Sequence, residues 1–154
     1  MAERKRQVKK VKINKGESCW TYLDECFEEP QGFGFIYLIT NNLDGRIYVG
    51  KKQFTFRKKT RLSKKARIGT RKRVEITRVD SGWQNYWSSC RPLVEDVKTL
   101  GQDKFSRQIL MFCKNKSELS YYELYFQIKY EVLLKPSYNG WINAKVYKNK
   151  LWQE

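Results

Sequence analysis

The chain has 154 residues, 40% of them hydrophobic and 15% aromatic, so it can form one ordinary domain with a modest core. Its formal net charge of +16, from 32 Lys and Arg against 16 Asp and Glu, exceeds what solubility requires and predicts a polyanionic partner, with nucleic acid ahead of a membrane surface. The absence of histidine excludes His-dependent nucleases and Ser-His-Asp triads.

The N-terminal residues carry no targeting pattern. Residues 1–6 read MAERKR and no apolar stretch follows them, so we expect no signal peptide and a cytoplasmic location. No stretch approaches the roughly 18 apolar residues of a spanning helix, so we expect no membrane partner. The four cysteines form no CxxC pair, and we expect them to be reduced rather than to bind zinc: Cys19, Cys26, Cys90 and Cys113.

Residues 1–31 divide into two segments of opposite charge. Residues 1–16 form a basic arm with one acidic residue, Glu3. Residues 17–29 contain five carboxylates and no basic residue, and we interpret them as an acidic surface segment. Pro30 and Gly32 then separate this segment from the first ordered pattern.

A β-hairpin is predicted next. Residues 33–40 (FGFIYLIT) and 46–50 (RIYVG) are rich in β-branched and aromatic residues, and the turn-forming sequence NNLDG lies between them. A turn centred on the middle of this loop gives cross-strand partners whose numbers sum to 85. Tyr37 and Tyr48 are then direct neighbours on one face of the hairpin.

Residues 51–78 are strongly basic and contain few apolar residues. Phe54 and Phe56 can anchor the start of this block, whereas the remainder suggests a mobile or DNA-ordered loop around Gly69. The basic side chains in and before it are the candidate DNA-binding residues: Lys51, Lys52, Lys58, Lys59, Arg61, Lys64, Lys65, Arg67, Arg71, Lys72 and Arg73.

A first helix follows an aromatic patch, Trp83, Tyr86 and Trp87, which is expected to be core rather than a base-stacking platform. Ser89 is its expected cap, Pro92 suits its first turn and Gly101 stops it. The apolar stripe consists of Leu93, Val94, Val97 and Leu100.

A third strand is predicted over residues 105–113, and a second helix from Ser117 to Pro136. Glu123 lies inside the apolar stripe of that helix. A carboxylate buried there without a partner costs several kcal/mol, so a cation, strong donors or a metal should meet it. The elements together predict an α+β fold with a small three-stranded antiparallel sheet flanked by helices.

Two short motifs resemble a known family. Phe35-Ile36-Tyr37 and Tyr48-Val49-Gly50 are similar to the two half-motifs that name the GIY-YIG nucleases, and their tyrosines are eleven residues apart. Phe35 and Val49 depart from the family letters. The resemblance covers residues 33–143, and it implies a nuclease domain over 32–147, with a basic insertion at 58–80 and a tail at 148–154.

The resemblance also implies roles for residues. Tyr37 is the general base toward water, Tyr48 orients the water or phosphate, and Glu123 holds one Mg²⁺ or Mn²⁺ ion. Arg57 is expected on a helix after the second half-motif, where it clamps the phosphate. Asn139 positions site groups, and it fits this role better than Asn143. Tyr86 is the candidate for a further catalytic group, and Lys51 and Lys52 are possible substitutes for it.

The partner that the resemblance implies is double-stranded DNA. The family includes phage-encoded, restriction and homing enzymes, and a phage-encoded member would act in the host cytoplasm.

Each residue of the implied site also has a structural alternative. The tyrosines can be packed aromatics, Arg57 can steer phosphate only, and Glu123 can pair with Arg57. A non-catalytic basic nucleic-acid-binding protein, or a GIY-YIG domain that no longer cuts, also fits the sequence.

Overall fold

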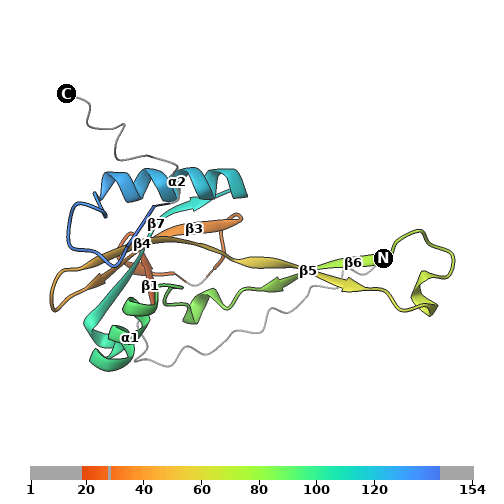
Figure 1. Cartoon of the computed structure of the whole chain (residues 1–154), viewed down its shortest axis with the longest axis horizontal. Helices are drawn as coiled ribbons and strands as arrows, with labels where there is room; N and C mark the ends of the chain where they lie inside the picture. Colours follow the sequence, from red (N-terminus) through yellow and green to blue (C-terminus); the bar gives the residue numbers. More distant parts are fainter. Residues whose placement is uncertain (1–18, 28, 143–154) are drawn as a thin grey trace.

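The computed structural model describes residues 19–27 and 29–142. They form a five-stranded mixed sheet in the order β2-β1-β7-β3-β4, with α1 and α2 on opposite sides of it (Figure 1). The predicted α+β class is confirmed. The predicted three-stranded sheet is too small, because two short strands from the acidic segment extend it.

The centre of the sheet is antiparallel and consists of the three predicted strands. They are β3 (Gly34–Asn41), β4 (Ile47–Gln53) and β7 (Phe105–Cys113). Side chains alternate between the faces of β3, so Phe35, Tyr37 and Ile39 pack on the α1 face and Ile36 packs on the α2 face. β4 is an edge strand of this sheet.

The predicted register of the β3–β4 hairpin is wrong by two residues. Tyr37 pairs with Gly50, and Tyr48 pairs with Ile39, so partner numbers sum to 87 rather than 85. The cause is the turn, in which Asn41 N–H donates to Arg46 O at 2.9 Å and Gly45 N–H donates to Asn41 O at 2.8 Å. Since the offset is two residues, Tyr37 and Tyr48 still share a face as diagonal neighbours.

The two additional strands are β1 (Trp20–Tyr22) and β2 (Glu25–Cys26). β1 runs parallel to β7, and Trp20 is 2% exposed with its ring against Phe35 and Tyr37. These strands precede residue 32, where the nuclease domain was expected to begin, so the sheet extends beyond that position.

A disulfide links Cys19 and Cys26, so the expectation of four reduced cysteines is wrong for this pair. The β1–β2 hairpin pairs Thr21 with Cys26 and brings the two cysteine Cα atoms to 5.8 Å. A separation of seven residues gave no sequence signal for this pairing. Cys90 and Cys113 are free.

Helix α1 (Arg91–Leu100) packs Leu93 and Val97 into the core, as the stripe predicted. Its N-cap is Cys90 rather than the expected Ser89, and no side chain caps it. Pro92 in the first turn explains this start, because proline lacks an N–H that would need a cap. Gly101, at φ +96°, ends the helix as predicted.

Helix α2 (Lys116–Lys129) is capped by Asn115, whose side-chain oxygen accepts hydrogen bonds from the Ser117 and Glu118 N–H groups at 3.0 Å each. The helix ends at Lys129, earlier than the predicted stop at Pro136, and residues 130–136 form turns. Leu119 is buried against the sheet, whereas Leu133 of the predicted stripe is 51% exposed. Three short 3₁₀ turns complete the helical elements: η1 (Lys65–Arg67), η2 (Trp83–Asn85) and η3 (Gln102–Lys104).

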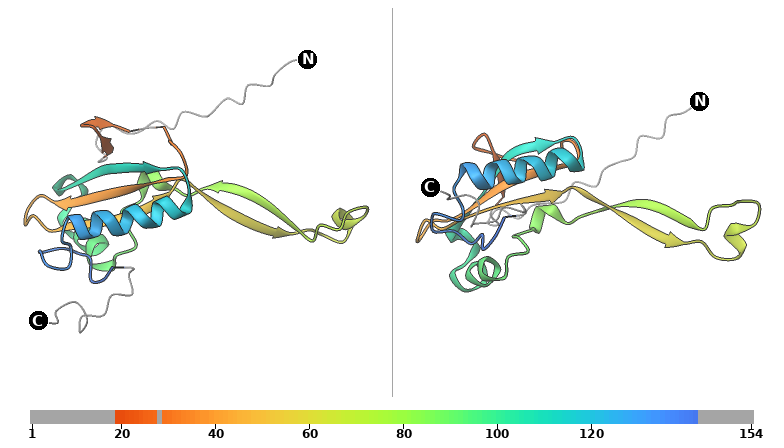
Figure 2. Two further views of the ribbon diagram at one scale, coloured as in Figure 1. Left: turned by 90° about the horizontal axis from the view of Figure 1, so that it is seen from above. Right: turned by 45° about the horizontal axis from the view of Figure 1, so that its top comes forward.

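The basic insertion is a two-stranded antiparallel ribbon rather than the predicted loop. β5 (Thr55–Arg61) pairs with β6 (Val74–Asp80), and residues 62–73 form the tip. The ribbon projects from the body of the molecule in every view (Figures 1 and 2). Cross-strand backbone hydrogen bonds hold the ribbon together although it has no hydrophobic core. The loop was predicted from the low apolar content of this segment, which does not report on such bonds.

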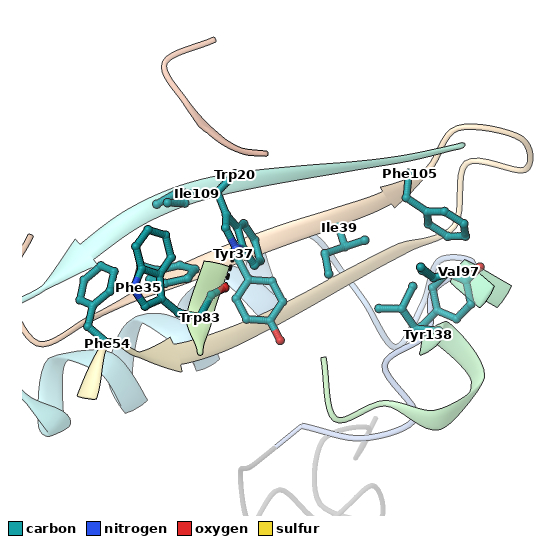
Figure 3. Close-up of a cluster of buried hydrophobic side chains, with 11 residues drawn as sticks. Trp20, Phe35, Tyr37, Ile39, Phe54, Trp83, Val97, Phe105, Ile109 and Tyr138 are labelled. Atoms are coloured by element: carbon teal, nitrogen blue, oxygen red, sulfur yellow. Dashed lines mark hydrogen bonds between the residues drawn. The ribbon is translucent and has the colours of Figure 1, made fainter. Parts of the chain in front are cut away.

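The larger core cluster lies on the α1 face of the sheet and is strongly aromatic (Figure 3). Trp83 is 1% exposed, and Trp20 Nε1 donates to Trp83 O at 2.9 Å. Tyr86 and Trp87 pack against the cluster, in agreement with the expected core role of this patch. Tyr37 belongs to the cluster, but its hydroxyl points out of it. No helix in the described part of the chain is long and apolar enough to cross a membrane.

Candidate active site

The candidate site lies along the outer edge of β4. The Tyr48 side chain lies on the α1 face, to which Gly50 also turns its Cα, and the side chains of Val49 and Lys51 lie on the α2 face. Residues 137–139 run beside this edge, where Ser137 bridges Ile47 in parallel and Tyr138 N–H donates to Ile47 O at 2.8 Å. The edge therefore brings groups from both faces of the sheet together.

Asn139 fastens this closing segment to the strand. Its Oδ1 accepts the Val49 N–H at 2.9 Å, and its Nδ2 donates to Val49 O at 2.9 Å. Gln127 Nε2, from α2, donates to the same carbonyl at 3.3 Å. Asn139 is 8% exposed, so its amide is engaged in holding the backbone beside Tyr48.

A cleft of ≈ 440 Å³ opens at this edge. It receives side chains from β4, the loop before α1, α2 and the closing segment. Its lining consists of Tyr48, Lys51, Ser89, Cys90, Glu123, Gln127, Tyr138, Asn139, Gly140 and Trp141. The cleft is therefore where three of the predicted catalytic residues, Tyr48, Glu123 and Asn139, meet, together with Lys51, which was predicted to bind DNA.

Glu123 forms an ion pair with Lys51, not with Arg57. Lys51 Nζ lies 2.8 Å from Glu123 Oε2 and donates to Ser120 Oγ at 3.2 Å. The Glu123 side chain is 16% exposed and the Lys51 side chain 31% exposed. Of the partners expected for this carboxylate (a cation, strong donors or a metal), the structure shows a cation, and it comes from β4 rather than from Arg57.

Tyr37 lies behind the cleft and does not line it. It is 1% exposed, and burial raises its pKa well above 10, an effect increased by Tyr48 and Tyr86. A hydrogen bond with Ser88 acts in the opposite direction. Gly50 makes room for its phenol, because a Cβ at Gly50 would lie 2.6 Å from Tyr37 Oη. In the protein alone, Tyr37 is a buried neutral phenol.

Tyr48 is the tyrosine that reaches the cleft. Its ring centroid is 6.0 Å from that of Tyr37, and burial also raises its pKa above 10, while a hydrogen bond with Ser88 lowers it. Ser88 thus acts on both phenols and lowers the pKa of each. Its backbone has φ +130°, which a non-glycine residue adopts only under constraint.

Tyr86 and Lys52 form a second contact on the α1 face. Lys52 Nζ lies 3.8 Å from the centre of the Tyr86 ring, and burial lowers the Lys52 pKa. The Tyr86 ring is 6.1 Å from the Tyr37 ring. Arg107 holds this loop in place, since its Nη1 donates to Gln84 O at 3.0 Å and to Tyr86 O at 3.1 Å.

Arg57 is not brought into the cleft. The expectation that it lies on a helix is wrong, since it is an exposed residue of β5 in the ribbon, paired with Arg78. The other predicted DNA-binding cations of the insertion are exposed on the ribbon or its tip: Lys58, Lys59, Arg61, Lys64, Lys65, Arg67, Arg71, Lys72 and Arg73. Lys51 and Lys52 stay on β4, beside the site.

The family comparison agrees with this arrangement. Residues 20–150 match the family model described as "Putative endonuclease segE, GIY-YIG domain". The chain belongs to this GIY-YIG endonuclease family. The match begins at Trp20, so β1 and β2 lie within this GIY-YIG domain. No curated protein and no solved structure matches the chain.

The GIY-YIG domain offers one carboxylate at the cleft. Among the described residues, no group of three or more acidic, cysteine or histidine side chains gathers to enclose a metal ion. Mg²⁺ is commonly held by one or two carboxylates together with water and substrate phosphate, so a single Glu123 fits that ion. Gln127, one helical turn later, has a buried Oε1 without a hydrogen-bond partner among the described residues and also lines the cleft.

Three residues of this GIY-YIG site were missed by sequence reasoning. Ser88 gave no signal, because neither its position in a loop nor its backbone strain is visible in composition. Gln127 lies four residues after Glu123, and that helical spacing places both on one face. Arg107 stands at an inward position of an alternating strand, which indicates a buried cation with a structural task.

Proposed function

We propose that this GIY-YIG domain is a DNA endonuclease whose cleft at the edge of β4 hydrolyses phosphodiester bonds. The observation that carries the proposal is the Lys51–Glu123 ion pair in the same cleft as Tyr48. A carboxylate, a cation and a phenol at one concave edge can supply the acid-base and electrostatic catalysis that phosphodiester hydrolysis uses. Membership of an endonuclease family supports the same reaction.

Tyr48 is assigned the contact with the attacking water. Sequence analysis gave the role of general base to Tyr37, but Tyr48 lines the cleft whereas Tyr37 is 1% exposed. Tyr48 accepts the water proton as the water oxygen bonds to phosphorus and the bond to the leaving 3′ oxygen breaks. Burial raises the pKa of both phenols, so Tyr48 is protonated in the free protein. Positive charge in the loaded site is needed for Tyr48 to lose its own proton to solvent, and the resulting phenolate is the form that accepts the water proton.

Tyr37 is assigned a positioning role. Ser88 lowers the pKa of both phenols, and Gly50 leaves the space that the Tyr37 hydroxyl fills. This arrangement fixes the Tyr48 ring against a rigid core. Tyr86, held by Lys52 and by the Arg107 contacts to its loop, packs at the far side of Tyr37.

Glu123 is assigned to one divalent ion, Mg²⁺ or Mn²⁺, with Gln127 Oε1 as a neighbouring oxygen donor. When bound, such an ion supplies positive charge at the phosphoryl and leaving oxygens. Lys51, which pairs with Glu123 in the free protein, is the cation placed to contact a phosphoryl oxygen. Asn139 keeps the backbone between these side chains fixed.

Cleavage of supercoiled plasmid in the presence of Mg²⁺ tests the proposal. We expect nicked or linear product from the wild type and none from Glu123→Gln, which keeps the size of the side chain and removes its charge. The variant should bind duplex DNA as tightly as the wild type. Supercoils that persist at every protein, metal and salt concentration would instead support a non-catalytic DNA-binding domain.

A further inference from the structure

The ribbon of β5 and β6 has two unlike faces. Cross-strand partners share a face, and residues two apart along a strand share it too. One face, the cationic face, carries Arg57, Lys59, Arg61 and Arg78 together with the apolar Val74 and Ile76. The opposite face carries one cation, Lys58, and one anion, Glu75, with Phe56, Thr60, Thr77 and Val79.

The positive charges of the cationic face are not neutralised by ion pairs within the described part of the chain. Arg57 and Arg78 are direct cross-strand partners, and like charges in that relationship are destabilising. None of the four cations forms an ion pair with a carboxylate in the described part of the chain. Asp80, at the base beside Thr55, is the acidic residue on this face. Such a face is suited to an external anion.

The dimensions of the ribbon suit one anion in particular. Each strand has seven residues, or about 23 Å of extended chain. The ribbon stands clear of the body, and its residues from Phe56 to Arg61 and from Val74 to Asp80 are exposed (Figure 2). The major groove of B-DNA, about 12 Å wide, admits a two-stranded β-ribbon. Arginines within it can reach phosphates or guanine edges, and apolar side chains can contact thymine methyl groups.

We propose that the ribbon lies in the major groove of duplex DNA with its cationic face toward the DNA, and that Arg57 and Arg78 act there as a pair. This inference rests on the proposed function, because it takes DNA as the substrate held in the neighbouring cleft. It gives Arg57 a binding role in place of the phosphate clamp expected from sequence. The tip adds cations that attract the backbone without reading sequence: Lys64, Lys65, Arg67, Arg71, Lys72 and Arg73.

Lys58 and Lys59 provide a matched pair for the test. They are adjacent, exposed lysines on one strand that face opposite sides of the ribbon. Binding of the full chain to a labelled 30-base-pair duplex is measured by fluorescence anisotropy in EDTA over a series of salt concentrations. We expect Lys59→Gln to reduce the slope of log affinity against log salt by about 0.9, the value of one phosphate contact. Lys58→Gln should leave both slope and affinity unchanged.

The double variant Arg57→Gln/Arg78→Gln should reduce the slope by about 1.8, if each arginine contacts one phosphate. Equal effects of Lys58→Gln and Lys59→Gln would overturn the assignment of the face. Circular dichroism of each variant verifies folding, and the double variant should be no less stable, since it removes a like-charge pair. Unchanged binding by both Lys59→Gln and the double variant would show that the ribbon does not contact DNA.

Binding to two other polyanions, duplex RNA and anionic vesicles, distinguishes binding in the major groove from general charge attraction. The major groove of A-form RNA is deep and narrow, so Lys59→Gln and Lys58→Gln should bind duplex RNA of the same sequence equally well. Vesicles with anionic lipid should not separate the two lysines either. A difference between the lysines on RNA or vesicles that matches the one on DNA contradicts groove binding. The anisotropy is measured without divalent metal, so failure of the ribbon proposal leaves Glu123-dependent cleavage to be judged by the plasmid experiment.

Discussion

Lys51 Nζ lies 2.8 Å from Glu123 Oε2, so the edge strand and the helix on the α2 face share one charged contact inside the cleft. This contact gives Glu123 a cation partner in the free protein, and a divalent ion at Glu123 must share the carboxylate with the lysine or displace it. The pair is partly exposed, which limits its worth to about 1 kcal/mol or less.

Replacement of Lys51 by methionine should strengthen metal binding and weaken cleavage. Without the competing ammonium group, Mn²⁺ should bind up to about fivefold more tightly, the equivalent of roughly 1 kcal/mol. Titration followed by electron paramagnetic resonance measures this affinity. Lys58→Met, a change on the distant ribbon, is the control. An unchanged or weaker Mn²⁺ affinity in Lys51→Met contradicts the placement of the ion at Glu123.

Removal of the Tyr48 hydroxyl should affect the reaction more than binding. Loss of a proton-transfer group typically reduces rate by about 10² to 10⁴, so Tyr48→Phe should lower the single-turnover cleavage rate by at least about 10². Its affinity for duplex DNA in EDTA should remain that of the wild type. Tyr121→Phe, on the exposed side of α2, should cleave normally. A Tyr48→Phe protein with the wild-type cleavage rate would falsify the assignment of the water contact.

Gly50 should not tolerate a side chain, because a new Cβ would lie 2.6 Å from Tyr37 Oη and 2.8 Å from Tyr48 Cε1. Gly50→Ala must therefore displace both rings, and we expect a loss of about 1–3 kcal/mol in the free energy of unfolding. Cleavage should fall with it. Gly140 provides the control, since a Cβ there meets nothing within 4 Å. Urea unfolding of the two alanine variants decides the matter, and equal midpoints would mean that Gly50 has no packing role.

The central strands and helices could be predicted from the sequence because the order of apolar and polar residues within each segment determines them. The strand over residues 105–113 was predicted with the bounds that the structure has, since its second half is an unbroken apolar run. Glu123 was expected to point inward and to meet a cation, strong donors or a metal, because it interrupts an apolar stripe, and Lys51 is the cation it meets. The predicted hairpin register was wrong by two residues because the turn depends on the Asn41 and Gly45 hydrogen bonds, which composition does not fix.

Long-range contacts account for what the sequence could not predict. Trp20 joins the core through parallel pairing with Arg107 of β7, far along the chain, and the Cys19–Cys26 disulfide depends on the hairpin next to it. Arg57 was assigned by its place after the second half-motif, but an inserted ribbon carries it away from the cleft. Ser88 became a candidate only when two strands and a loop had placed it between two phenols.

Asn139 should contribute to stability through its pairing with Val49. Asn139→Ala leaves the Val49 N–H without its acceptor at a buried position, which costs about 1–3 kcal/mol. Thermal unfolding should therefore begin at a lower temperature. Asn42→Ala, which removes exposed contacts to Ser106, is the comparison and should change stability far less. If both variants melt together, the closing segment is not held by this amide.

The free energy of unfolding should depend on alkaline pH in a way that reports the burial of Tyr37. Its folded pKa is raised well above the unfolded value near 10, so the folded state keeps a proton that the unfolded state loses. The stability linked to this proton is complete below pH 10 and is lost as the pH rises from there toward the folded pKa. Tyr37→Phe has no such proton. Between pH 9 and 11 the wild type should lose about 1 kcal/mol more than the variant in urea unfolding, whereas Tyr121→Phe should follow the wild type. Parallel pH curves for Tyr37→Phe and the wild type would contradict a buried, neutral Tyr37.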